Sequence, residues 1–196
     1  MGKKNTPPPG KTKIINAMRI LLEDHNFSTI TISDIAVTAG VTEGLIYKYF
    51  KDKRQLLHHV LREHYEYFLC QIDRDLNGVS GALNKLGKVI WSSIDRYANH
   101  RVFARIILLE VRNSDEYFQS EAYALVRRFN KILLDIIKEG MESGEIRRDV
   151  SPSLIRHTIF GTIEHACLNR VIFNEKVSTD QTAEQITHLI LNGIKP

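Results

Sequence analysis

One stretch near the N-terminus constrains the fold more than any other part of the chain: residues 31–53, TISDIAVTAGVTEGLIYKYFKDK. Thr31 stands where a helix N-cap is expected, and Asp34, three residues later, completes a capping box. Gly40 can adopt the positive φ that ends a helix, and Thr42 can cap the next one. The stretch therefore predicts two short helices joined by a tight turn, a helix-turn-helix.

The second of these helices has one apolar and one polar side. Ile46 and Phe50 are four residues apart, so they share the side that would be buried. The other side presents residue types that read DNA grooves, and basic residues follow where the next helix would approach the phosphates. These residues are Thr42, Glu43, Gly44, Leu45, Tyr47, Lys48 and Tyr49, followed by Lys51, Lys53 and Arg54.

The net charge of +4 belongs to this part of the chain. Lysine and arginine outnumber aspartate and glutamate in residues 1–64, whereas the two signs balance in residues 65–196. A basic module next to a neutral one is typical of a DNA-binding head attached to a larger domain. The two cysteines, Cys70 and Cys167, lie far apart and favour a reducing compartment, so we expect the cytoplasm.

The rest of the chain shows helical spacing of its apolar residues and no alternating strand pattern. We expect a first helix over 11–26 and a long fourth helix from Asp52 to about Leu76, shared between the head and the remainder. After the turn cluster NGVSG, five more helices are predicted over 81–97, 102–112, 115–142, 152–174 and 179–193. The predicted fold class is therefore all-α, with nine helices.

The run I-A-x-x-A-G-V-T-x-G-x-I-Y-x-Y-F-x-x-K in residues 35–53 resembles the signature of the tetracycline-repressor (TetR) family of bacterial transcription regulators. The helix count and the chain length are also similar to that family. The segments LLEVRNSDEYF, EGMESGEIRRDV and IRHTIFGTIE resemble the subgroup that controls fatty-acid degradation and responds to acyl-CoA thioesters. The resemblance implies a helix-turn-helix head and a larger domain that binds an effector and dimerises.

The resemblance also implies roles for single residues of the head. Phosphates would be contacted by Thr31, Ser33, Thr42, Tyr47 and Lys53, and base edges would be faced by Glu43, Gly44, Leu45, Lys48 and Tyr49. The chemistry is suitable, because Lys48 can donate to guanine and Glu43 can accept from cytosine N4. Two alternatives stay open: Glu43 could act only on the helix dipole, and Tyr49 could be half-buried beside Phe50.

A single short recognition helix reads too few base pairs to find one site in a genome, so we expect a homodimer on a palindromic operator. The last two helices carry more apolar surface than one amphipathic face needs, and in the family they form a four-helix bundle across the dimer. An alternative is that this surface is core within one chain. The expected interface residues are Ile159, Ile163, Cys167, Ile186 and Ile190.

Residues 81–142 hold more aromatic and aliphatic side chains than a small core requires, which predicts a ligand tunnel. Each of these residues could instead be ordinary core, and arginines near the tunnel could be solvated surface. The expected ligand-binding residues are Trp91, Tyr97, Phe103, Arg105, Ile107, Phe129 and Leu133.

The domain organisation predicted from these features has three parts. We expect a disordered basic tail over 1–10, whose lysines could also touch DNA, a DNA-binding domain over 11–55 and an effector-binding and dimerisation domain over 56–196.

The predicted function is that of a transcriptional repressor bound to double-stranded DNA. A hydrophobic effector would release it from the DNA, and long-chain acyl-CoA is the candidate effector. Catalysis, a metal and a cofactor are not expected, because the chain lacks H-E-x-x-H, a nucleophile elbow, a P-loop and G-x-G-x-x-G. A membrane partner is not expected either, because no apolar stretch follows the polar N-terminal segment that could span a bilayer. Two alternatives are an efflux-pump regulator that responds to an apolar drug-like ligand and a helical protein-interaction module.

Overall fold

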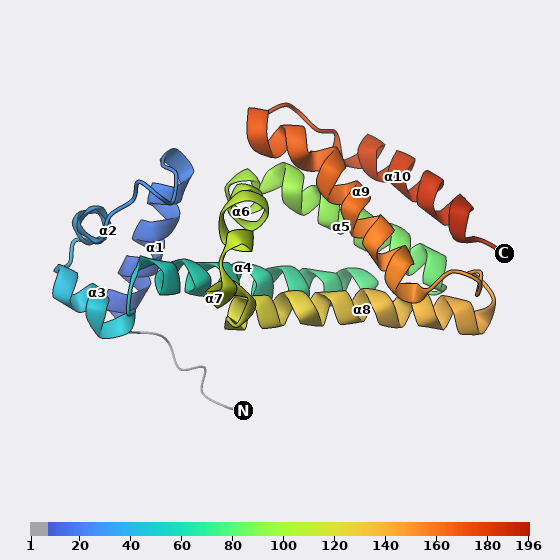
Figure 1. Cartoon of the computed structure of the whole chain (residues 1–196), viewed down its shortest axis with the longest axis horizontal. Coiled ribbons are helices and arrows are strands. Elements are labelled where there is room, and N and C mark those ends of the chain that lie inside the picture. Colours follow the sequence, from blue (N-terminus) through green and yellow to red (C-terminus); the bar gives the residue numbers. More distant parts are fainter. Residues whose placement is uncertain (1–7) are drawn as a thin grey trace.

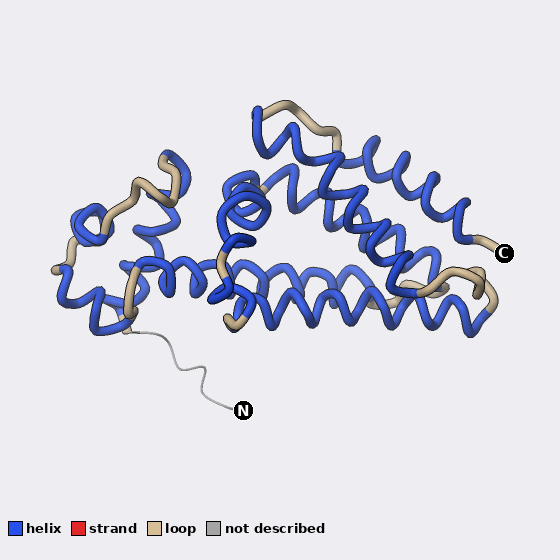
Figure 2. Tube along the Cα trace, viewed as in Figure 1, coloured by secondary structure: helices blue, strands red, loops and turns tan. Residues whose placement is uncertain are grey.

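The computed structural model describes residues 8–196, which form ten α-helices, one π-helical turn and one 3-10 turn, without a strand (Figures 1 and 2). Most of the predicted tail over 1–10 lies outside the described residues. The first helix, α1 (Pro9–Asp24), begins two residues before the expected start. Proline suits this position, because its φ is already helical and the first turn leaves backbone N–H groups without partners.

Three helices form a small head at one end of the molecule (Figure 1): α1, α2 (Ile32–Ala39) and α3 (Glu43–Tyr49). Thr31 accepts a hydrogen bond from the Asp34 backbone N–H, and the Asp34 carboxylate accepts one from the Thr31 backbone N–H at 2.8 Å. This confirms the predicted capping box. Gly40 has φ 63°, as expected for the residue that ends α2. The head is closed by buried side chains of all three helices, including Ile14, Met18, Leu22, Ile35 and Ile46.

The long helix α4 (Lys53–Leu76) leaves the head and runs the length of the larger part, which we call the body. Asp52 caps it by accepting the Gln55 backbone N–H at 2.8 Å, so the predicted limits of this helix are confirmed. Its first half, through Tyr65, packs in the hydrophobic cluster of the head, and its second half, from Phe68, packs in the cluster of the body. A single rigid element therefore joins the two.

Four further helices make up most of the body. α4 packs along α8 (Glu121–Ser143), while α5 (Ala82–Asn99) packs against α8, α9 (Pro152–Phe173) and α10 (Thr179–Ile194). Figure 1 shows α4 and α8 running nearly parallel to the long axis, with α5, α9 and α10 covering them on one side. The shared core is built mainly from isoleucine and leucine side chains, including Leu86, Ile90, Leu133, Ile137, Ile155, Ile159, Ile163 and Ile186.

Two of the predicted helices are interrupted, and the division of the second raises the number of α-helices over residues 8–196 from the predicted nine to ten. The segment expected as one helix over 102–112 is α6 (Arg101–Arg105), a π-helical turn over Ile106–Glu110 and a 3-10 turn over Val111–Asn113. The segment expected over 115–142 is divided into α7 (Asp115–Phe118) and α8. Ser120 causes this break, because its hydroxyl donates to the Tyr117 carbonyl and accepts the Tyr123 backbone N–H.

The end of the body remote from the head is closed by a contact between distant segments. The Glu145 carboxylate accepts the backbone N–H groups of Ala82 (3.0 Å) and Leu83 (3.3 Å) and thereby caps α5 from another loop. These bonds hold the pKa of Glu145 below its usual value. Gly140 lies beside this contact, and a side chain there would clash, since a Cβ would meet Ile146 Cδ1 at 2.5 Å.

Candidate DNA-binding surface and effector cavity

The recognition helix α3 has the predicted division into two sides. Ile46 and Phe50 are buried in the head, and the opposite side exposes Glu43, Gly44, Tyr47 and Lys48, with Tyr47 exposed to 55%. Thr42 occupies the N-cap position, but its hydroxyl makes no capping bond, so it can still contact a phosphate. This exposed set is a continuous polar surface at the tip of the head.

Leu45 and Tyr49 depart from the prediction that they face base edges. Both are half-buried and pack on the hydrophobic cluster of the head. They are four residues apart on α3, so they turn together toward the start of α1, where a Cβ on Gly10 would meet Leu45 Cδ2 at 3.0 Å. We therefore assign these two residues to packing, in agreement with the alternative left open for Tyr49.

The second predicted phosphate-contacting set lies at the start of α2. Ser33 is exposed in the first turn of that helix. Thr31 is also exposed, but its hydroxyl already bonds the Asp34 carboxylate at 2.7 Å and accepts the Asp34 backbone N–H at 3.1 Å. The hydrogen bonds hold the pKa of Asp34 below its usual value, so the carboxylate stays ionised and the cap stays formed near neutral pH. Of the two residues, Ser33 has the freer hydroxyl.

Lys53 also differs from its prediction as a phosphate contact. Its Nζ donates to the carbonyl oxygens of Phe27 (3.1 Å), Ser28 (3.1 Å) and Ile30 (2.7 Å), and it lies 4.8 Å from the centre of the Phe27 ring. An ammonium has only three donors, and all three are used within the chain. Lys53 therefore fastens the loop between α1 and α2 to the start of α4.

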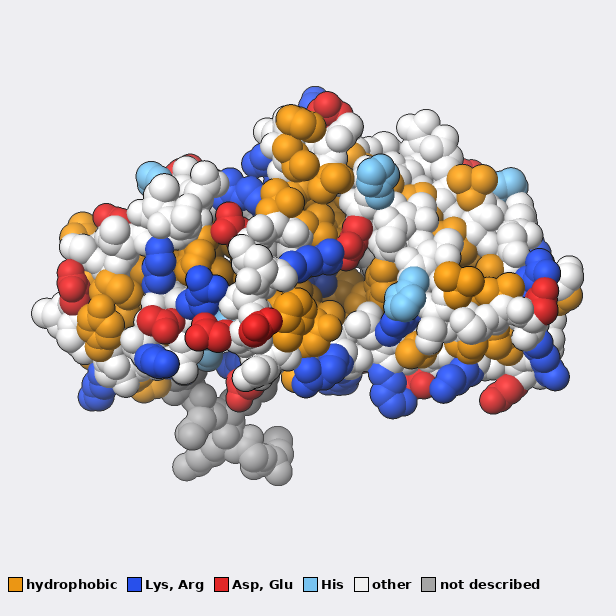
Figure 3. Space-filling view, in the orientation of Figure 1, with side chains coloured by type: hydrophobic (Ala, Val, Ile, Leu, Met, Phe, Trp, Pro, Cys, Tyr) orange, Lys and Arg blue, Asp and Glu red, His pale blue; other side chains and the backbone are white. Residues whose placement is uncertain are grey.

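The body contains a cavity of about 410 Å³ that lies between α4, α5, α8 and α9 and is also lined by the π-helical turn over Ile106–Glu110 and by α7. Its volume falls within the range of small-molecule sites. In Figure 3 the surface of the body is hollowed between orange side chains, with lysine or arginine side chains around the hollow. The lining residues are Tyr65, Phe68, Ser93, Arg96, Tyr97, Ile107, Arg112, Tyr117, Phe118, Tyr123, Val126, Phe129, Asn130, Arg156, His157, Phe160 and Glu164.

The cavity has an aromatic floor and a charged rim. Phe68, Phe129 and Tyr117 are buried, and the Tyr117 hydroxyl lies 3.0 Å from the Tyr65 hydroxyl. Burial raises the pKa of Tyr97 and of Tyr117, so both phenols remain neutral and act as hydrogen-bonding groups. An apolar ligand group could therefore lie on the floor without meeting a charge on these tyrosines.

The rim holds one arginine that forms an ion pair and another, Arg156, that forms none among residues 8–196. Arg112 donates to both oxygens of the Glu164 carboxylate, at 2.9 and 2.5 Å, and this bond raises the pKa of Arg112. Arg156 Nε is buried and has no hydrogen-bond partner among residues 8–196. Arg127 does not line the cavity, but it is exposed and lies 5.3 Å from the ring centre of Tyr123, which does. The rim therefore suits a ligand with an anionic head group.

Three of the predicted ligand residues, Tyr97, Ile107 and Phe129, line this cavity. The other four lie elsewhere, because their side chains are used in other contacts. Trp91 donates to Asp180 at 2.8 Å, Phe103 stacks on His64 with ring centres 3.9 Å apart, and Leu133 is fully buried core. The fourth is Arg105.

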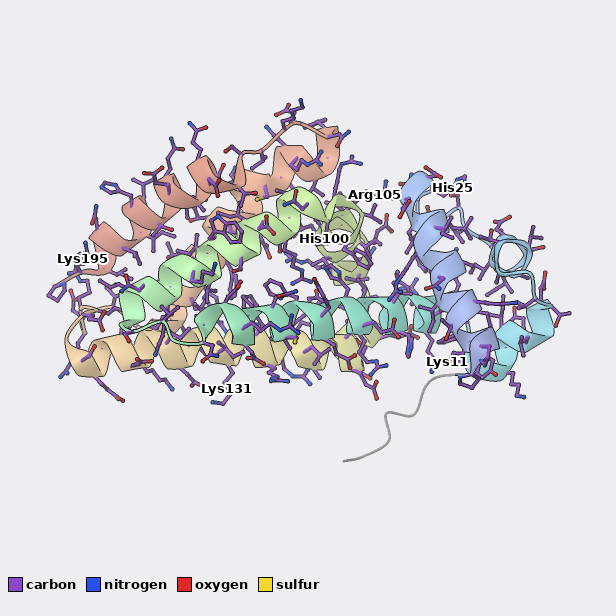
Figure 4. The ribbon with its side chains drawn as sticks, turned by 180° about the vertical axis from the view of Figure 1, so that it is seen from behind. Lys11, His25, His100, Arg105, Lys131 and Lys195 are labelled. Carbon is purple, nitrogen blue, oxygen red and sulfur yellow. The ribbon has the colours of Figure 1, made fainter. Side chains whose placement is uncertain are left out.

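Arg105 connects the body to the head. Its Nη2 donates to the carbonyl oxygens of Leu22 (3.2 Å) and His25 (3.1 Å) at the end of α1. Figure 4 shows Arg105 and His25 on facing parts of the body and the head. Ile107, which lines the cavity, follows two residues later in the π-helical turn. A ligand that displaces this turn would therefore act on α1 as well as on α4.

The five residues predicted at the dimer interface are buried within the chain. Ile159, Ile163 and Cys167 are fully buried, while Ile186 and Ile190 are exposed to 5% and 8%. They point inward because the apolar stripe at 155, 159, 163 and 167 of α9 packs on α5 and α8. The apolar side chains that α9 and α10 leave on the outside, here called the α9–α10 face, are Leu154, Ile172, Phe173 and Leu189.

Other kinds of site find no support in the described part of the chain. Residues 8–196 contain no group of three or more His, Cys, Asp or Glu side chains placed to hold a metal ion. No helix over these residues combines the length and the apolar character that crossing a bilayer requires.

Comparison with family models matches the chain in two adjoining segments. Residues 14–60 match the family described as bacterial regulatory proteins, tetR family, and residues 61–193 match the C-terminal region of YsiA-like proteins. Together these matches span the head, α4 and the body.

Relatives and solved structures that are similar to this chain include regulators of fatty acid metabolism. A fatty acid metabolism regulator protein of Bacillus subtilis (strain 168) is 28% identical over 186 residues, covering 95% of this chain and 96% of that protein. The crystal structure of FadR from Bacillus subtilis in complex with stearoyl-CoA is 29% identical, with a TM-score of 0.83 over 93% of this chain and 98% of that chain. The fatty acid degradation regulator FadR from Bacillus halodurans is 25% identical, with the same TM-score of 0.83 over 96% and 98%.

Proposed function

This chain belongs to the TetR family of bacterial regulatory proteins, and from that premise we propose that it is a repressor released from its operator by a long-chain acyl-CoA. One observation carries the proposal: a cavity of about 410 Å³ with an aromatic floor and an arginine-rich rim adjoins the helix that begins in the DNA-binding head. An acyl chain suits the floor, and the phosphates of coenzyme A suit the rim. The stearoyl-CoA complex of a similar protein supports this choice of ligand.

On the DNA side, we propose that the protein acts as a homodimer on a palindromic operator in the cytoplasm. Lys48, Glu43 and Gly44 would face base edges, and Ser33, Thr42 and Tyr47 would contact phosphates. Thr31 would contribute through its backbone position, since its hydroxyl is used in the cap.

For the dimer, we propose an interface built on the α9–α10 face. Leu189 is exposed to 72% and Phe173 to 67%, and large apolar side chains at such exposure are suited to an interface between copies. Two copies packed through this face would be related by two-fold symmetry, which matches the symmetry of a palindromic operator.

The release mechanism follows from the position of the cavity. A ligand between α4, α5, α8 and α9 would push on α4 and on the turn that follows Arg105, and both contact the head. Movement of the head would change the spacing of the two recognition helices, which operator DNA fixes. The ligand can weaken DNA binding only by its differential affinity for the two forms, which for a coupling of about 1–3 kcal/mol is roughly 5- to 150-fold.

The test is a titration of acyl-CoAs of several chain lengths against the dimer bound to a fluorescent operator selected from random duplexes. We expect long-chain acyl-CoA to release the operator and free CoA to have no effect. Unchanged operator affinity across the whole series would contradict the proposal. Release by apolar dyes alone would favour a drug-responsive regulator, and the absence of salt-dependent duplex binding would favour a protein-interaction module.

A further inference from the structure

Arg96 has an unusual position on the floor of the cavity. It projects from α5, and its guanidinium lies 4.5 Å from the ring centre of Tyr65 and 4.3 Å from that of Phe68. Both rings belong to α4 and line the cavity together with Arg96. The guanidinium is therefore held in place by two cation–π contacts and is not a freely moving surface group.

The hydrogen bonds of Arg96 are incomplete. Its Nε donates to His64 Nε2 at 3.0 Å, whereas Nη2 is buried and has no hydrogen-bond partner among residues 8–196. None of the carboxylates in that part of the chain forms an ion pair with it within 4.0 Å. Arg112, on the rim of the same cavity, differs because its Nη1 and Nη2 both donate to the Glu164 carboxylate.

His64 cannot compensate for the missing partner. It is stacked on Phe103 at 3.9 Å, and burial, followed by the nearby charge of Arg96, lowers its pKa to about 2. The ring is therefore neutral and offers Arg96 a single acceptor nitrogen, with its other nitrogen carrying the proton. The guanidinium therefore keeps an unpaired donor beside the cavity.

Arg96 and Phe68 also separate the cavity from a second one. This second space, of about 220 Å³, lies on the other side of the two residues and is lined by Tyr67, Gln71, Asp75, Trp91 and Asp95, among others. Arg96 thus forms part of the wall that the two cavities share. The Nη2 donor is already buried and unpaired without a ligand, so a hydrocarbon chain end against this wall would leave it unpaired, whereas a ligand oxygen would satisfy it.

We propose that Arg96 donates a hydrogen bond to an oxygen of the bound acyl group, so that the protein selects an acyl chain carrying a carbonyl or carboxylate at this depth over a plain alkyl chain. The inference rests on the proposed function and narrows the class of ligand that the cavity would bind. The oxygen has two possible sources, the thioester carbonyl itself or a carboxylate at the far end of the chain. In either case a charged donor that is buried meets an acceptor, and charge-assisted hydrogen bonds of this kind are strong.

The experiment compares three coenzyme A derivatives by calorimetry on the full-length dimer. These are palmitoyl-CoA, S-hexadecyl-CoA, which has a thioether and no carbonyl, and the 16-carbon acyl-CoA that ends in a carboxylate. If the thioester is the source, palmitoyl-CoA binds the unmodified protein roughly 10- to 100-fold more tightly than the thioether. If the far end is the source, the carboxylate derivative binds more tightly than palmitoyl-CoA by a similar factor.

Arg96→Met tests whether this preference comes from the guanidinium. Methionine can fill the space between the two rings without a donor, so the preference should fall to within about 3-fold, while Arg96→Lys should keep part of it. The matched control is Arg128→Met, which removes an exposed arginine of α8 that pairs with Asp73 at 3.5 Å and does not line the cavity. This control should keep the full preference.

Two results would overturn the inference. Equal binding of all three derivatives by the unmodified protein would do so without any variant, so the test does not depend on how well Arg96→Met folds. An undiminished preference in a folded Arg96→Met protein would do so as well. In both cases acyl-CoA still binds and the proposed function stands, whereas binding of none of the three derivatives would contradict both proposals.

Discussion

The head and the body carry sites of opposite construction. The DNA-binding surface consists of exposed side chains from two short helices that are adjacent in sequence. The cavity is lined by residues spread from Tyr65 to Glu164, on elements that come together only in the folded body. The head therefore depends on local capping and turn geometry, and the body depends on packing between distant segments. Substitutions should affect the two parts in different ways.

The largest effect is expected from a charge placed in the packed stripe of the body. Ile163 is fully buried between α9 and its neighbours, so Ile163→Asp should lower the free energy of unfolding by more than about 4 kcal/mol, because the carboxylate has no partner there. Urea denaturation followed by circular dichroism measures this loss.

The matched control for this change lies on the outside of α10. Leu189 is exposed to 72%, so Leu189→Asp should change the free energy of unfolding by at most about 0.5 kcal/mol and instead shift the dimer toward monomer in sedimentation. A folded monomeric Ile163→Asp protein would return Ile163 to the interface, contrary to the burial described above.

A change of intermediate size in the free energy of unfolding is expected at the start of α4. Comparing it with a change on α3 distinguishes residues that stabilise the head from residues that contact DNA bases. Lys53→Ala should lower the free energy of unfolding by about 1–3 kcal/mol, because three carbonyl oxygens lose their charged donor. Thermal unfolding of the variant in the absence of DNA measures this loss.

Lys48→Ala is the companion change on the exposed side of α3. It should leave unfolding nearly unchanged and weaken operator binding by about 1–3 kcal/mol, with less effect on random duplex. Equal losses on both DNAs would remove its base-reading role, and unchanged stability of Lys53→Ala would mean that this lysine is free for phosphate after all.

The smallest change in the free energy of unfolding is expected at Arg105, where the body contacts the head. Arg105→Met should cost about 1 kcal/mol in unfolding and leave ligand affinity unchanged, but it should reduce the operator release that the ligand causes, because the bonds to α1 are lost. Operator titrations with and without acyl-CoA measure the coupling.

Arg101→Met is the control from the same short helix. Arg101 donates to the carbonyl oxygens of Arg170 and Ile172, so this contact stays within the body. We expect its loss to leave the coupling intact. A coupling that is the same in both variants and in the unmodified protein would exclude Arg105 as a connection between the parts.

The same contrast explains which features could be predicted from the sequence. The capping box at Thr31, the positive φ of Gly40 and the start of α4 at Asp52 are set by residues within four positions of each other, and all were predicted. The half-burial of Leu45 depends on α1, and the three acceptors of Lys53 come from a loop more than 20 residues away. Contacts between distant segments of this kind produce no periodic pattern of residues in the sequence.

The cavity and the interface could not be predicted fully from the sequence for another reason. The stripe at 155, 159, 163 and 167 has the helical spacing of any buried face, and this spacing does not say whether the covering helix belongs to the same chain or to a partner. Similarly, Arg96 and Glu164 have the same surroundings in sequence as surface residues. Their place in the cavity follows only from how α5 and α9 cross.

The continuity of α4 has a consequence for what changes the chain can accept. Its 24 residues span about 36 Å, and the cavity meets the helix at Tyr65 and Phe68, about 20 Å from its start, so a tilt of about 5° there would displace its head end by roughly 2 Å. Length and phase are also linked, because one inserted residue would lengthen the helix by about 1.5 Å and rotate the head by about 100°. Insertions and deletions within α4 should therefore be far rarer among functional variants than substitutions on its exposed side, whereas the turn at 77–81 can vary in length without reorienting the head.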